Sequence, residues 1–299
     1  MNFLKKKYVF AIFYTVFLSG VTIYILMDTF VLKKEYIKIE NDSVEEEILT
    51  EDNESKIITE NSYKDENISI MINEYREYDT TIYVADIKVK DIKYLKTALA
   101  NDTYGKNVTQ KTSEIANENN AVLAINGDFY GAQEKGFVLK NGIIYRDTAS
   151  SNQEDLAIYE NGTFEIINES DINLNNLLNN GAYNILSFGP CLLKENAIQV
   201  TSNEEVGKAM ASNPRTAIGV IEDLHYVFVV SDGRTNESEG LSLYELAEFM
   251  QELDVDLAYN LDGGGSSTMY FNGNVINNPT TNGKSIKERS VSDIVYIGY

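Results

Sequence analysis

The sequence predicts an α+β protein, in which a strand-rich mixed-sheet domain with a few packed helices follows one transmembrane helix. Three observations lead to this prediction. Residues 8–27 contain no charged side chain. Most later apolar segments are short, and several alternate with polar residues as half-buried strands do. Helical spacing of apolar side chains is clear only near residues 243–253.

The apolar segment at residues 8–27 directly follows three lysines. About 20 apolar residues cross the hydrocarbon core of a bilayer as a helix. A cleavable signal usually has a shorter apolar region and a small-residue cleavage site, and neither is evident near Ser19. We therefore expect an uncleaved anchor at 8–27. Since lysine-rich flanks stay in the cytoplasm, residues 1–7 are expected to form a cytoplasmic tail of a single-pass protein in the cell membrane, with the rest extracytoplasmic.

Residues 28–67 are dominated by acidic side chains. Between residues 40 and 66 there are 11 acids and two lysines, without a steady apolar period. Such a segment cannot bury enough surface to offset the entropy of ordering the chain. We expect a disordered acidic stalk at 28–67, followed by one large domain at 68–299.

Composition limits the possible chemistry of this domain. A net charge of −21 argues against nucleic acid as a partner, because binding to phosphates needs basic patches. The single cysteine, Cys191, excludes an internal disulfide. The single histidine, His225, is expected in a turn, which disfavours a Ser-His-Asp triad and a zinc site. We interpret both residues as structural, so carboxylates must carry any acid–base chemistry.

The domain is expected to be built from short strands, two Asn-Gly hairpins and two helices. An Asn-Gly pair tolerates the positive φ angles of tight hairpin turns, and Ser242 with Glu245 forms a capping box at a helix start. The predicted strands are 68–72, 80–89, 121–125, 217–221, 226–230, 257–261 and 291–297; the hairpin turns are 141–142 and 161–162; the helices are 109–119 and 243–253.

Three aspartates each follow a predicted strand and lie next to glycine: Asp128, Asp232 and Asp262. Each could instead brace its own turn, which is a common use of aspartate beside glycine. Their repetition at strand ends favours function. Pairs of carboxylates suit glycoside cleavage, in which one handles a proton and the other attacks the sugar or activates water.

The segment after Asp262 is the most unusual in the chain. It reads Gly263, Gly264, Gly265, Ser266, Ser267 and lies between two apolar strands. Three glycines allow rare backbone angles and a close approach to a ligand, and the amides of such a loop can bind an anion. The alternative is a flexible turn, but the flanking strands do not have linker composition. No Walker or GxGxxG pattern is present.

Three arginines also lie beside predicted strand ends, at Arg215, Arg234 and Arg289. A guanidinium binds phosphate or carboxylate in a bidentate manner. Surface ion pairs are the alternative, since acids are abundant. Their places next to strand-end loops favour an anion site.

Six motifs occur in one order: Asn126-Gly127-Asp128-Phe129-Tyr130, Ser187-Phe188-Gly189-Pro190, Pro214-Arg215-Thr216-Ala217-Ile218-Gly219, Ser231-Asp232-Gly233-Arg234, Asn260-Leu261-Asp262-Gly263-Gly264-Gly265-Ser266-Ser267 and Glu288-Arg289. Over residues 80–299 this order resembles the phosphodiester glycosidase family, which includes many bacterial proteins related to exopolysaccharide. The resemblance implies a mixed α/β catalytic domain that hydrolyses a sugar-1-phosphate diester into free sugar and phosphomonoester. It also implies these site residues: Asn126, Asp128, Arg215, Thr216, Asp232, Arg234, Asp262, Gly263, Gly264, Gly265, Ser266, Ser267 and Arg289.

We expect Asp262, Asp232 and Asp128 to be catalytic, and the remaining site residues to bind substrate and its phosphate. This mechanism needs no cofactor. A rival is attack at phosphorus by a metal-activated nucleophile, with the three aspartates holding calcium, magnesium or manganese. A second rival is a surface module that binds anionic polysaccharide without cleaving it. The expected partners are glycosyl-phosphate or polysaccharide substrates of the cell envelope.

Overall fold

The computed structural model describes residues 8–38, 56–202 and 212–299. Over these ranges it is rich in strands and holds four α-helices, so the predicted α+β class is confirmed. The helices are α1 (Val9–Phe30), α2 (Thr112–Glu118), α3 (Leu174–Asn179) and α4 (Leu243–Glu252). One feature differs from the expected mixed sheets, because the described strands pair in antiparallel directions throughout.

The largest sheet has nine strands, and a second has five. In spatial order the nine are β15 (Ala197–Ile198), β14 (Cys191–Lys194), β18 (Leu257–Asn260), β16 (Thr216–Glu222), β17 (His225–Ser231), β5 (Thr80–Val89), β4 (Ile68–Glu77), β3 (Ser62–Lys64) and β2 (Ile57–Ile58). The five are β20 (Asn274–Val275), β19 (Met269–Phe271), β8 (Leu123–Asn126), β21 (Asp293–Ile297) and β6 (Leu95–Leu99).

Three smaller sheets complete the domain. They are the three-stranded β12 (Phe164–Asn168), β11 (Glu154–Tyr159) and β13 (Ala182–Leu186), and the pairs β10 (Ile143–Thr148) with β9 (Gly136–Lys140) and β1 (Lys34–Lys38) with β7 (Thr103–Lys106). The hairpin turns predicted at 141–142 and 161–162 connect β9 to β10 and β11 to β12, as expected from their Asn-Gly pairs.

The main core lies where the sheets face one another. Side chains such as Phe228 of the nine-stranded sheet, Ile125 of the five-stranded sheet and Leu156 of β11 belong to one buried cluster. Helix α4 covers the opposite face of the nine-stranded sheet through residues such as Leu246 and Phe249. Its start shows the predicted capping box between Ser242 and Glu245. The sheets are therefore fixed from both sides, which makes their edges rigid supports for a site.

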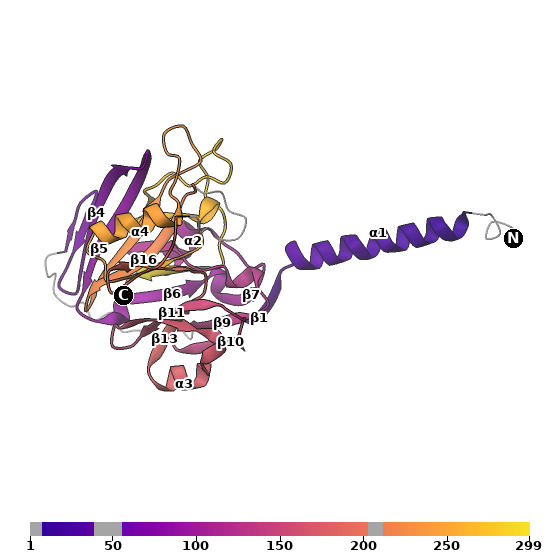
Figure 1. Ribbon diagram of the computed structural model, residues 1–299, viewed down its shortest axis with the longest axis horizontal. Helices are drawn as coiled ribbons and strands as arrows, with labels where there is room; N and C mark the ends of the chain where they lie inside the picture. Colours follow the sequence, from indigo (N-terminus) through magenta and orange to yellow (C-terminus); the bar gives the residue numbers. More distant parts are fainter. Residues whose placement is uncertain (1–7, 39–55, 203–211) are drawn as a thin grey trace.

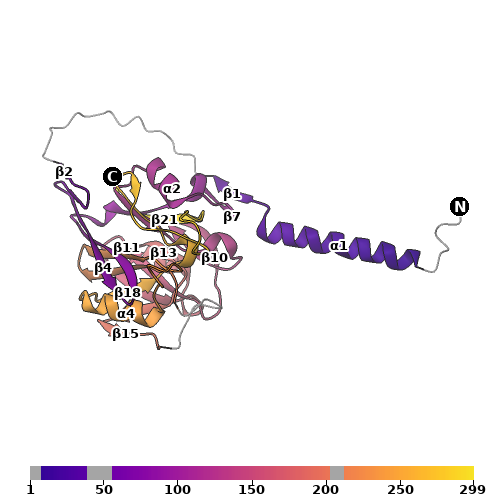
Figure 2. The same cartoon turned by 90° about the horizontal axis from the view of Figure 1, so that it is seen from above.

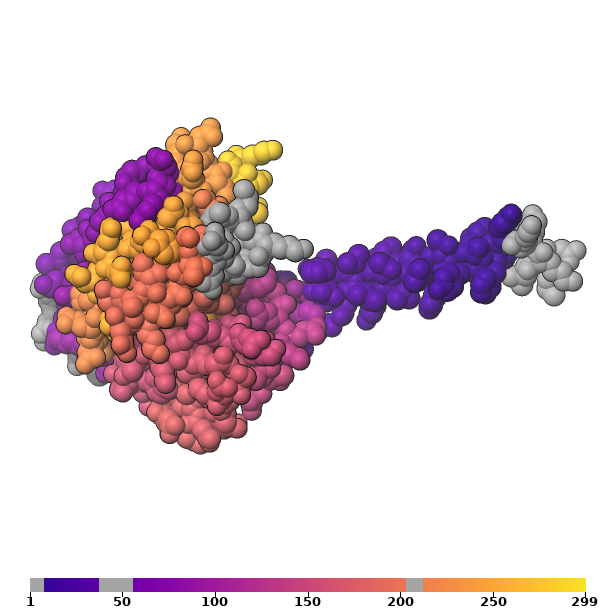
Figure 3. All heavy atoms as spheres, viewed as in Figure 1, coloured from indigo at the N-terminus to yellow at the C-terminus, as the bar shows by residue number. Residues whose placement is uncertain are grey.

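Helix α1 projects from the side of the domain on which β1 and β7 lie (Figures 1 and 3). It has 22 residues, is apolar enough to cross a membrane, and is almost entirely exposed. A membrane anchor and a signal sequence share these properties. The helix extends slightly beyond the predicted span of 8–27.

Strands at both ends of the expected stalk correct its boundaries. β1 follows α1 and pairs with β7, while β2 and β3 add to the edge of the nine-stranded sheet, and Figure 2 shows the two ends on separate parts of the domain. Tyr63 of β3 is buried. Three strands that precede residue 68 thus belong to the sheets of the domain. The acidic middle, 39–55, lies outside the described residues.

Candidate active site

Antiparallel pairing brings several of the predicted site residues together at the ends of three central strands of the nine-stranded sheet. β18 ends just before Asp262, and its Asn260 pairs with Ala217 of β16, so Arg215 precedes β16 at the same end of the sheet. β17 pairs with β16 and ends there too, just before Asp232. Neighbouring antiparallel strands place the end of one beside the start of the next. This register explains why segments far apart in sequence meet.

A small cavity of about 180 Å³ lies at these strand ends. We call it the arginine pocket, because three of its eight lining residues are arginines. It is lined by Phe188, Asn213, Arg215, Arg234, Asp262, Gly263, Gly264 and Arg289. Six of these positions were predicted from the sequence as catalytic or phosphate-binding: Arg215, Arg234, Asp262, Gly263, Gly264 and Arg289.

Asp262 is the carboxylate of the arginine pocket. It is 9% exposed, and its Oδ2 accepts hydrogen bonds from the Ser266 hydroxyl at 2.6 Å and from Arg289 Nη2 at 3.0 Å. Burial raises the pKa of Asp262 above its ordinary value, although Arg289 and Ser266 act in the opposite direction. A carboxylate with a raised pKa at the wall of a cavity can exchange a proton or attack an electrophile.

Arg289 fixes both Asp262 and the serine that follows the triglycine. Its Nε donates to Ser266 Oγ at 2.9 Å, and its side chain is 40% exposed. The Ser266 hydroxyl is thus held between a carboxylate and a guanidinium. Arg289 reaches this position because it precedes β21, which pairs with β8 in the adjoining sheet.

The other two arginines are held by backbone and amide acceptors. Arg215 is 4% exposed and donates from Nε to the Leu241 carbonyl at 2.8 Å. Arg234 donates from Nη2 to Asn213 Oδ1 at 2.8 Å and from Nη1 to the Thr281 carbonyl at 2.6 Å. Burial, and then the charges of Arg289 and Arg215, lower the pKa of Arg234. Three guanidinium groups therefore act on one small volume, which favours an anionic ligand.

The glycines keep room for these groups. Gly264 has φ of +62°, and a Cβ there would lie 2.8 Å from Arg234 Nη2. A Cβ on Gly265 would lie 2.3 Å from Thr281 Oγ1. The triglycine is therefore an ordered turn packed between neighbours, which supports the functional interpretation over the flexible one.

Asn126 and Thr216 hold the triglycine loop in place through buried hydrogen bonds. The Asn126 side chain donates to the Asp262 carbonyl at 2.6 Å, and its Oδ1 accepts from Thr216 Oγ1 at 2.9 Å. Both residues are buried and do not line the arginine pocket. Ser267 is also fully buried. The motif positions therefore divide into residues that face the pocket and residues that orient the loop.

Asp232 lies next to the pocket residues in sequence but faces another loop. Its Oδ1 accepts a hydrogen bond from the backbone amide of Asn278 at 2.8 Å, and its Oδ2 accepts one from the side-chain Nδ2 of the same residue at 2.9 Å. Asn277 adds a longer contact and also donates to the Ser267 carbonyl. Asp232 does not line the cavity. In this geometry it ties the 277–278 turn to the triglycine loop.

Asp128 belongs to a separate buried cluster of three charged side chains, Lys140, Asp128 and Asp293, which we call the lysine centre. Lys140 Nζ is 2.9 Å from Asp128 Oδ2 and 2.7 Å from Asp293 Oδ2, and all three side chains are at most 2% exposed. Burial alone would lower the pKa of Lys140, but the two aspartates outweigh it and raise the pKa. Asp128 also accepts from the Ser187 amide. Its catalytic assignment has no support from this geometry.

Four residues of these two sites were not singled out from the sequence: Asn213 and Phe188 of the arginine pocket, and Lys140 and Asp293 of the lysine centre. Asn213 and Phe188 lie inside the quoted motif segments or next to them, so the motifs could have indicated them. Lys140 ends an ordinary strand, β9, and nothing in its local sequence indicates a buried charge.

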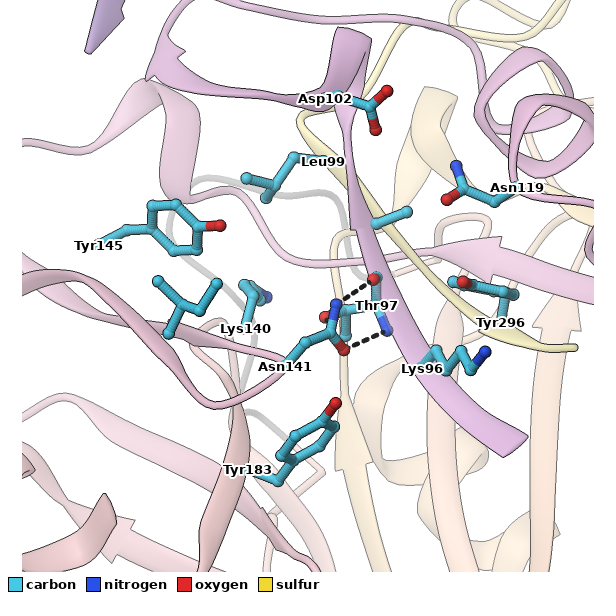
Figure 4. A pocket seen from close by; sticks show the side chains of 12 residues that line it. Lys96, Thr97, Leu99, Asp102, Asn119, Lys140, Asn141, Tyr145, Tyr183 and Tyr296 are labelled. Atoms are coloured by element: carbon cyan, nitrogen blue, oxygen red, sulfur yellow. Dashed lines mark hydrogen bonds between the residues drawn. The ribbon is translucent and has the colours of Figure 1, made fainter. Parts of the chain in front are cut away.

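A larger cavity, of about 320 Å³, has Lys140 among its lining residues (Figure 4). In Figure 4 Asn141 is bound to Thr97, and Tyr145, Tyr183 and Tyr296 line the walls. It contains no arginine and none of the residues predicted for the site. This cavity is larger than the arginine pocket, but the convergence of guanidinium groups and a carboxylate favours the smaller one as the candidate site.

The predicted metal ligands do not gather at one point. Within the described ranges no group of three or more His, Cys, Asp or Glu side chains is arranged to hold a metal ion. Asp128 binds Lys140, Asp232 binds Asn278, and Asp262 faces the arginines. Binding of a metal by these three aspartates together would require them to leave their present partners.

Comparison with known proteins agrees with the motif order. The family model described as phosphodiester glycosidase matches residues 119–298. The SPbeta prophage-derived uncharacterized protein YomE of Bacillus subtilis (strain 168) is 26% identical over 201 residues, which are 66% of this chain and 31% of that protein. The N-acetylglucosamine-1-phosphodiester alpha-N-acetylglucosaminidase of Mus musculus is 38% identical over 88 residues, 28% of this chain and 17% of that protein.

A solved structure shares the fold. The zebrafish N-acetylglucosamine-1-phosphodiester alpha-N-acetylglucosaminidase catalytic domain, auto-inhibited by its pro-peptide, superposes with a TM-score of 0.62 at 21% identity, covering 78% of this chain and 83% of that domain. The chain spans less than a third of the length of the two curated relatives named above.

Proposed function

Because the chain belongs to the phosphodiester glycosidase family, we propose that it binds a sugar-1-phosphate diester in the arginine pocket and hydrolyses the bond between the sugar and the phosphate. The products are a free sugar and a phosphomonoester. The observation that carries this proposal is the convergence of three guanidinium groups and one carboxylate, all from described residues, on one cavity. Guanidinium groups gathered in this way suit the single negative charge of a phosphodiester and the greater charge of the departing phosphate.

The leaving group explains why one carboxylate can be sufficient. Ordinary glycosidases use a second carboxylic acid to protonate an alkoxide-like leaving group. A phosphomonoester has a second pKa of about 6, so it leaves as an anion without that proton. The arginines meet the charge that develops on the phosphate, and each well-placed donor contributes about 3 kcal/mol to such stabilisation. Asp232 is then not required at the sugar, in agreement with its contacts to the 277–278 turn.

Asp262 is the group that we assign to the sugar carbon, as the base for water or as the nucleophile. In either role it reacts as the carboxylate. Burial makes it more basic than an ordinary aspartate, while Arg289 and Ser266 hold its Oδ2 in one orientation. The phosphate would lie toward Arg215, Arg234 and the backbone of Gly264, with Phe188 at another wall of the pocket.

We also propose that α1 is a retained membrane anchor and that the domain is extracytoplasmic. The contacts at the end of α1 support retention. Asn107 Nδ2 donates to the carbonyls of Thr29 and Leu32, and the Lys34 ammonium is 2.7 Å from Asp28. β1 then continues into the fold by pairing with β7. Substrates at this location are glycosyl phosphates of envelope polymers or exopolysaccharide.

The test is hydrolysis of a panel of sugar-1-phosphodiesters in oxygen-18 water by the full chain in detergent, followed by mass spectrometry of both products. We expect the label in the sugar. Label in the phosphate would overturn the proposal and indicate attack at phosphorus, as in the metal-dependent alternative. Binding of the panel without any hydrolysis would indicate the non-catalytic module instead.

A further inference from the structure

A second group of acids lies outside both sites, inside the three-stranded sheet region. Asp155 of β11 is fully buried, and Glu169 follows β12 and is 1% exposed. Neither forms an ion pair with lysine or arginine in the described parts of the chain. Both Asp155 oxygens are sealed from solvent and have no hydrogen-bond partner there. We call Asp155 and Glu169 the acidic pair.

Other oxygens converge on the same place. A Cβ on Gly136 would lie 3.3 Å from Glu169 Oε1, 3.5 Å from Gln133 Oε1 and 3.5 Å from Ser187 Oγ. The Ser187 hydroxyl is itself buried without a hydrogen-bond partner among the described residues. Glu169, Ser187 and Gln153 are also close enough to Asp155 to influence its pKa: beyond the rise caused by burial, Glu169 raises it, and the side chains of Ser187 and Gln153 lower it. Side-chain oxygens of Glu169, Gln133 and Ser187 therefore gather around Gly136.

Two buried carboxylates with no cation are energetically unfavourable. An isolated buried charge costs many kcal/mol, so such groups are normally paired, neutralised or bound to a metal. The side-chain atoms that could coordinate a cation here are all oxygens, with no sulfur or imidazole nitrogen. Hard cations prefer such oxygen ligands. Calcium accepts irregular sets of six to eight oxygens, including serine, amide and carbonyl oxygens and water.

We propose that the acidic pair and Ser187 bind one calcium ion, with Gln133 as a further ligand. The ion would balance the charge of Asp155 and Glu169. Glu169 also accepts backbone hydrogen bonds from Phe137 and Ser150, so its orientation is already set. This site is distinct from the aspartates considered for attack at phosphorus, and it takes no part in the proposed hydrolysis.

The ion would stabilise one wall of the arginine pocket. Ser187 directly precedes Phe188, which lines that pocket, and the Phe188 amide donates to the Tyr259 hydroxyl at 2.9 Å. The Ser187 amide is bound to Asp128 of the lysine centre. An ion bound to the Ser187 hydroxyl would add a third contact to this segment and limit the movement of Phe188.

The rival is a shared proton between the two acids. Without a cation, burial and Glu169 raise the pKa of Asp155 to about 9, so a neutral Asp155 could donate to Glu169. The substitution Asp155→Asn distinguishes the two, because asparagine imitates the neutral acid but is a poor calcium ligand by charge. Asp171→Asn, at an exposed aspartate near Glu169, is the matched control.

The experiment uses the full chain in detergent, treated with a chelator and then titrated with calcium or magnesium chloride. We expect one saturable calcium event in calorimetry with Kd of about 10⁻⁴–10⁻³ M, the range of extracellular modules, and a rise in melting temperature. Asp155→Asn should lose both, and Asp171→Asn should keep both. Should Asp155→Asn fail to fold, Ser187→Ala should still weaken calcium binding about tenfold or more.

Two results would overturn the proposal. If calcium leaves the melting temperature of the parent unchanged and Asp155→Asn melts like the parent, the acids share a proton. If Asp155→Asn and Ser187→Ala both keep the parent's calcium response, the ion binds elsewhere on this acidic chain. Neither result would affect the oxygen-18 test, so the two proposals fail separately.

Discussion

The arginine pocket and the lysine centre combine the same kinds of charge in opposite proportions. The pocket has three guanidinium groups to one carboxylate and opens to a cavity, whereas the lysine centre has two carboxylates to one ammonium and is sealed. In the sealed centre one ammonium pairs with two carboxylates, and burial together with Asp128 raises the pKa of Asp293 to about 7. In the open pocket three guanidinium groups and one carboxylate of the described residues line a cavity that a ligand can enter. We therefore expect access to a cavity, and not burial of an acid as such, to mark the site of chemistry.

The two sites are also connected. The Asp262 amide lies 3.4 Å from the carbonyl of Gly127, which directly precedes Asp128. A Cβ on Gly127 would lie 2.4 Å from Asp293 Oδ1. We therefore expect the lysine centre to support the strand end behind Asp262 and to take no part in the proposed reaction. The following predictions test this division, in order of decreasing expected effect.

Asp262→Asn should lower kcat/KM for a sugar-1-phosphodiester by roughly 10⁴-fold, because it removes the reacting carboxylate. The melting temperature should change little, since asparagine retains the shape of the side chain. Steady-state kinetics and a thermal melt are the measurements. Asp223→Asn, in an exposed turn, serves as the control. If Asp262→Asn is as active as the parent, the assignment of Asp262 is wrong.

Lys140→Met should lower the stability of the fold and leave the activity nearly unchanged, the opposite of Asp262→Asn. It leaves Asp128 and Asp293 buried without their cation, and breaking such a pair costs about 3–5 kcal/mol of unfolding free energy. Below the melting temperature, kcat should remain close to that of the parent. The measurement is chemical denaturation beside kinetics on the same sample. A folded variant without activity would show that the lysine centre is catalytic, and the comparison of the two sites would fail.

Arg234→Lys should lower kcat/KM by about 10²-fold, corresponding to about 3 kcal/mol. Lysine keeps the charge but cannot form two parallel hydrogen bonds to a phosphate. Loss of activity against a phosphodiester should exceed any change in melting temperature. Arg76→Lys on β4, at an arginine that does not line the pocket, is the matched control. Equal kinetics for Arg234→Lys and the parent would argue against phosphate recognition by Arg234.

The pH dependence should show the smallest effect. Because the reacting form of Asp262 is the carboxylate and burial raises its pKa, activity should fall as the pH decreases through a value above the ordinary 3.8. The charge of Arg289 opposes that rise, so Arg289→Gln should move the acidic limb to still higher pH. A profile of kcat/KM against pH for both proteins measures this shift. An acidic limb that moves to lower pH in Arg289→Gln would contradict the role of Asp262.

Local sequence patterns were sufficient for several of the elements and for the region of the site, but helix α3 and many short strands were not predicted. Asn-Gly pairs identified both hairpins, and the capping box located the start of α4. The apolar run of β18 followed by the triglycine identified the loop that forms the pocket floor. His225 is an exception, because it begins β17 instead of lying in the turn, with its Nε2 2.9 Å from Asp86 Oδ1. Local propensity does not fix the boundary between a turn and a strand to within one residue.

The sequence by itself determined the α+β class, the apolar helix and the motifs that contain the site, because these depend on composition and on short-range periodicity. Only the tertiary structure decided among the three aspartates. Asp128, Asp232 and Asp262 have the same local pattern, but the strand register gives them Lys140, Asn278 and Arg289 as their respective partners. Those partners come from distant segments. The reactivity of a carboxylate depends on its burial and on the charges beside it, and both are set by packing between segments that no local pattern connects.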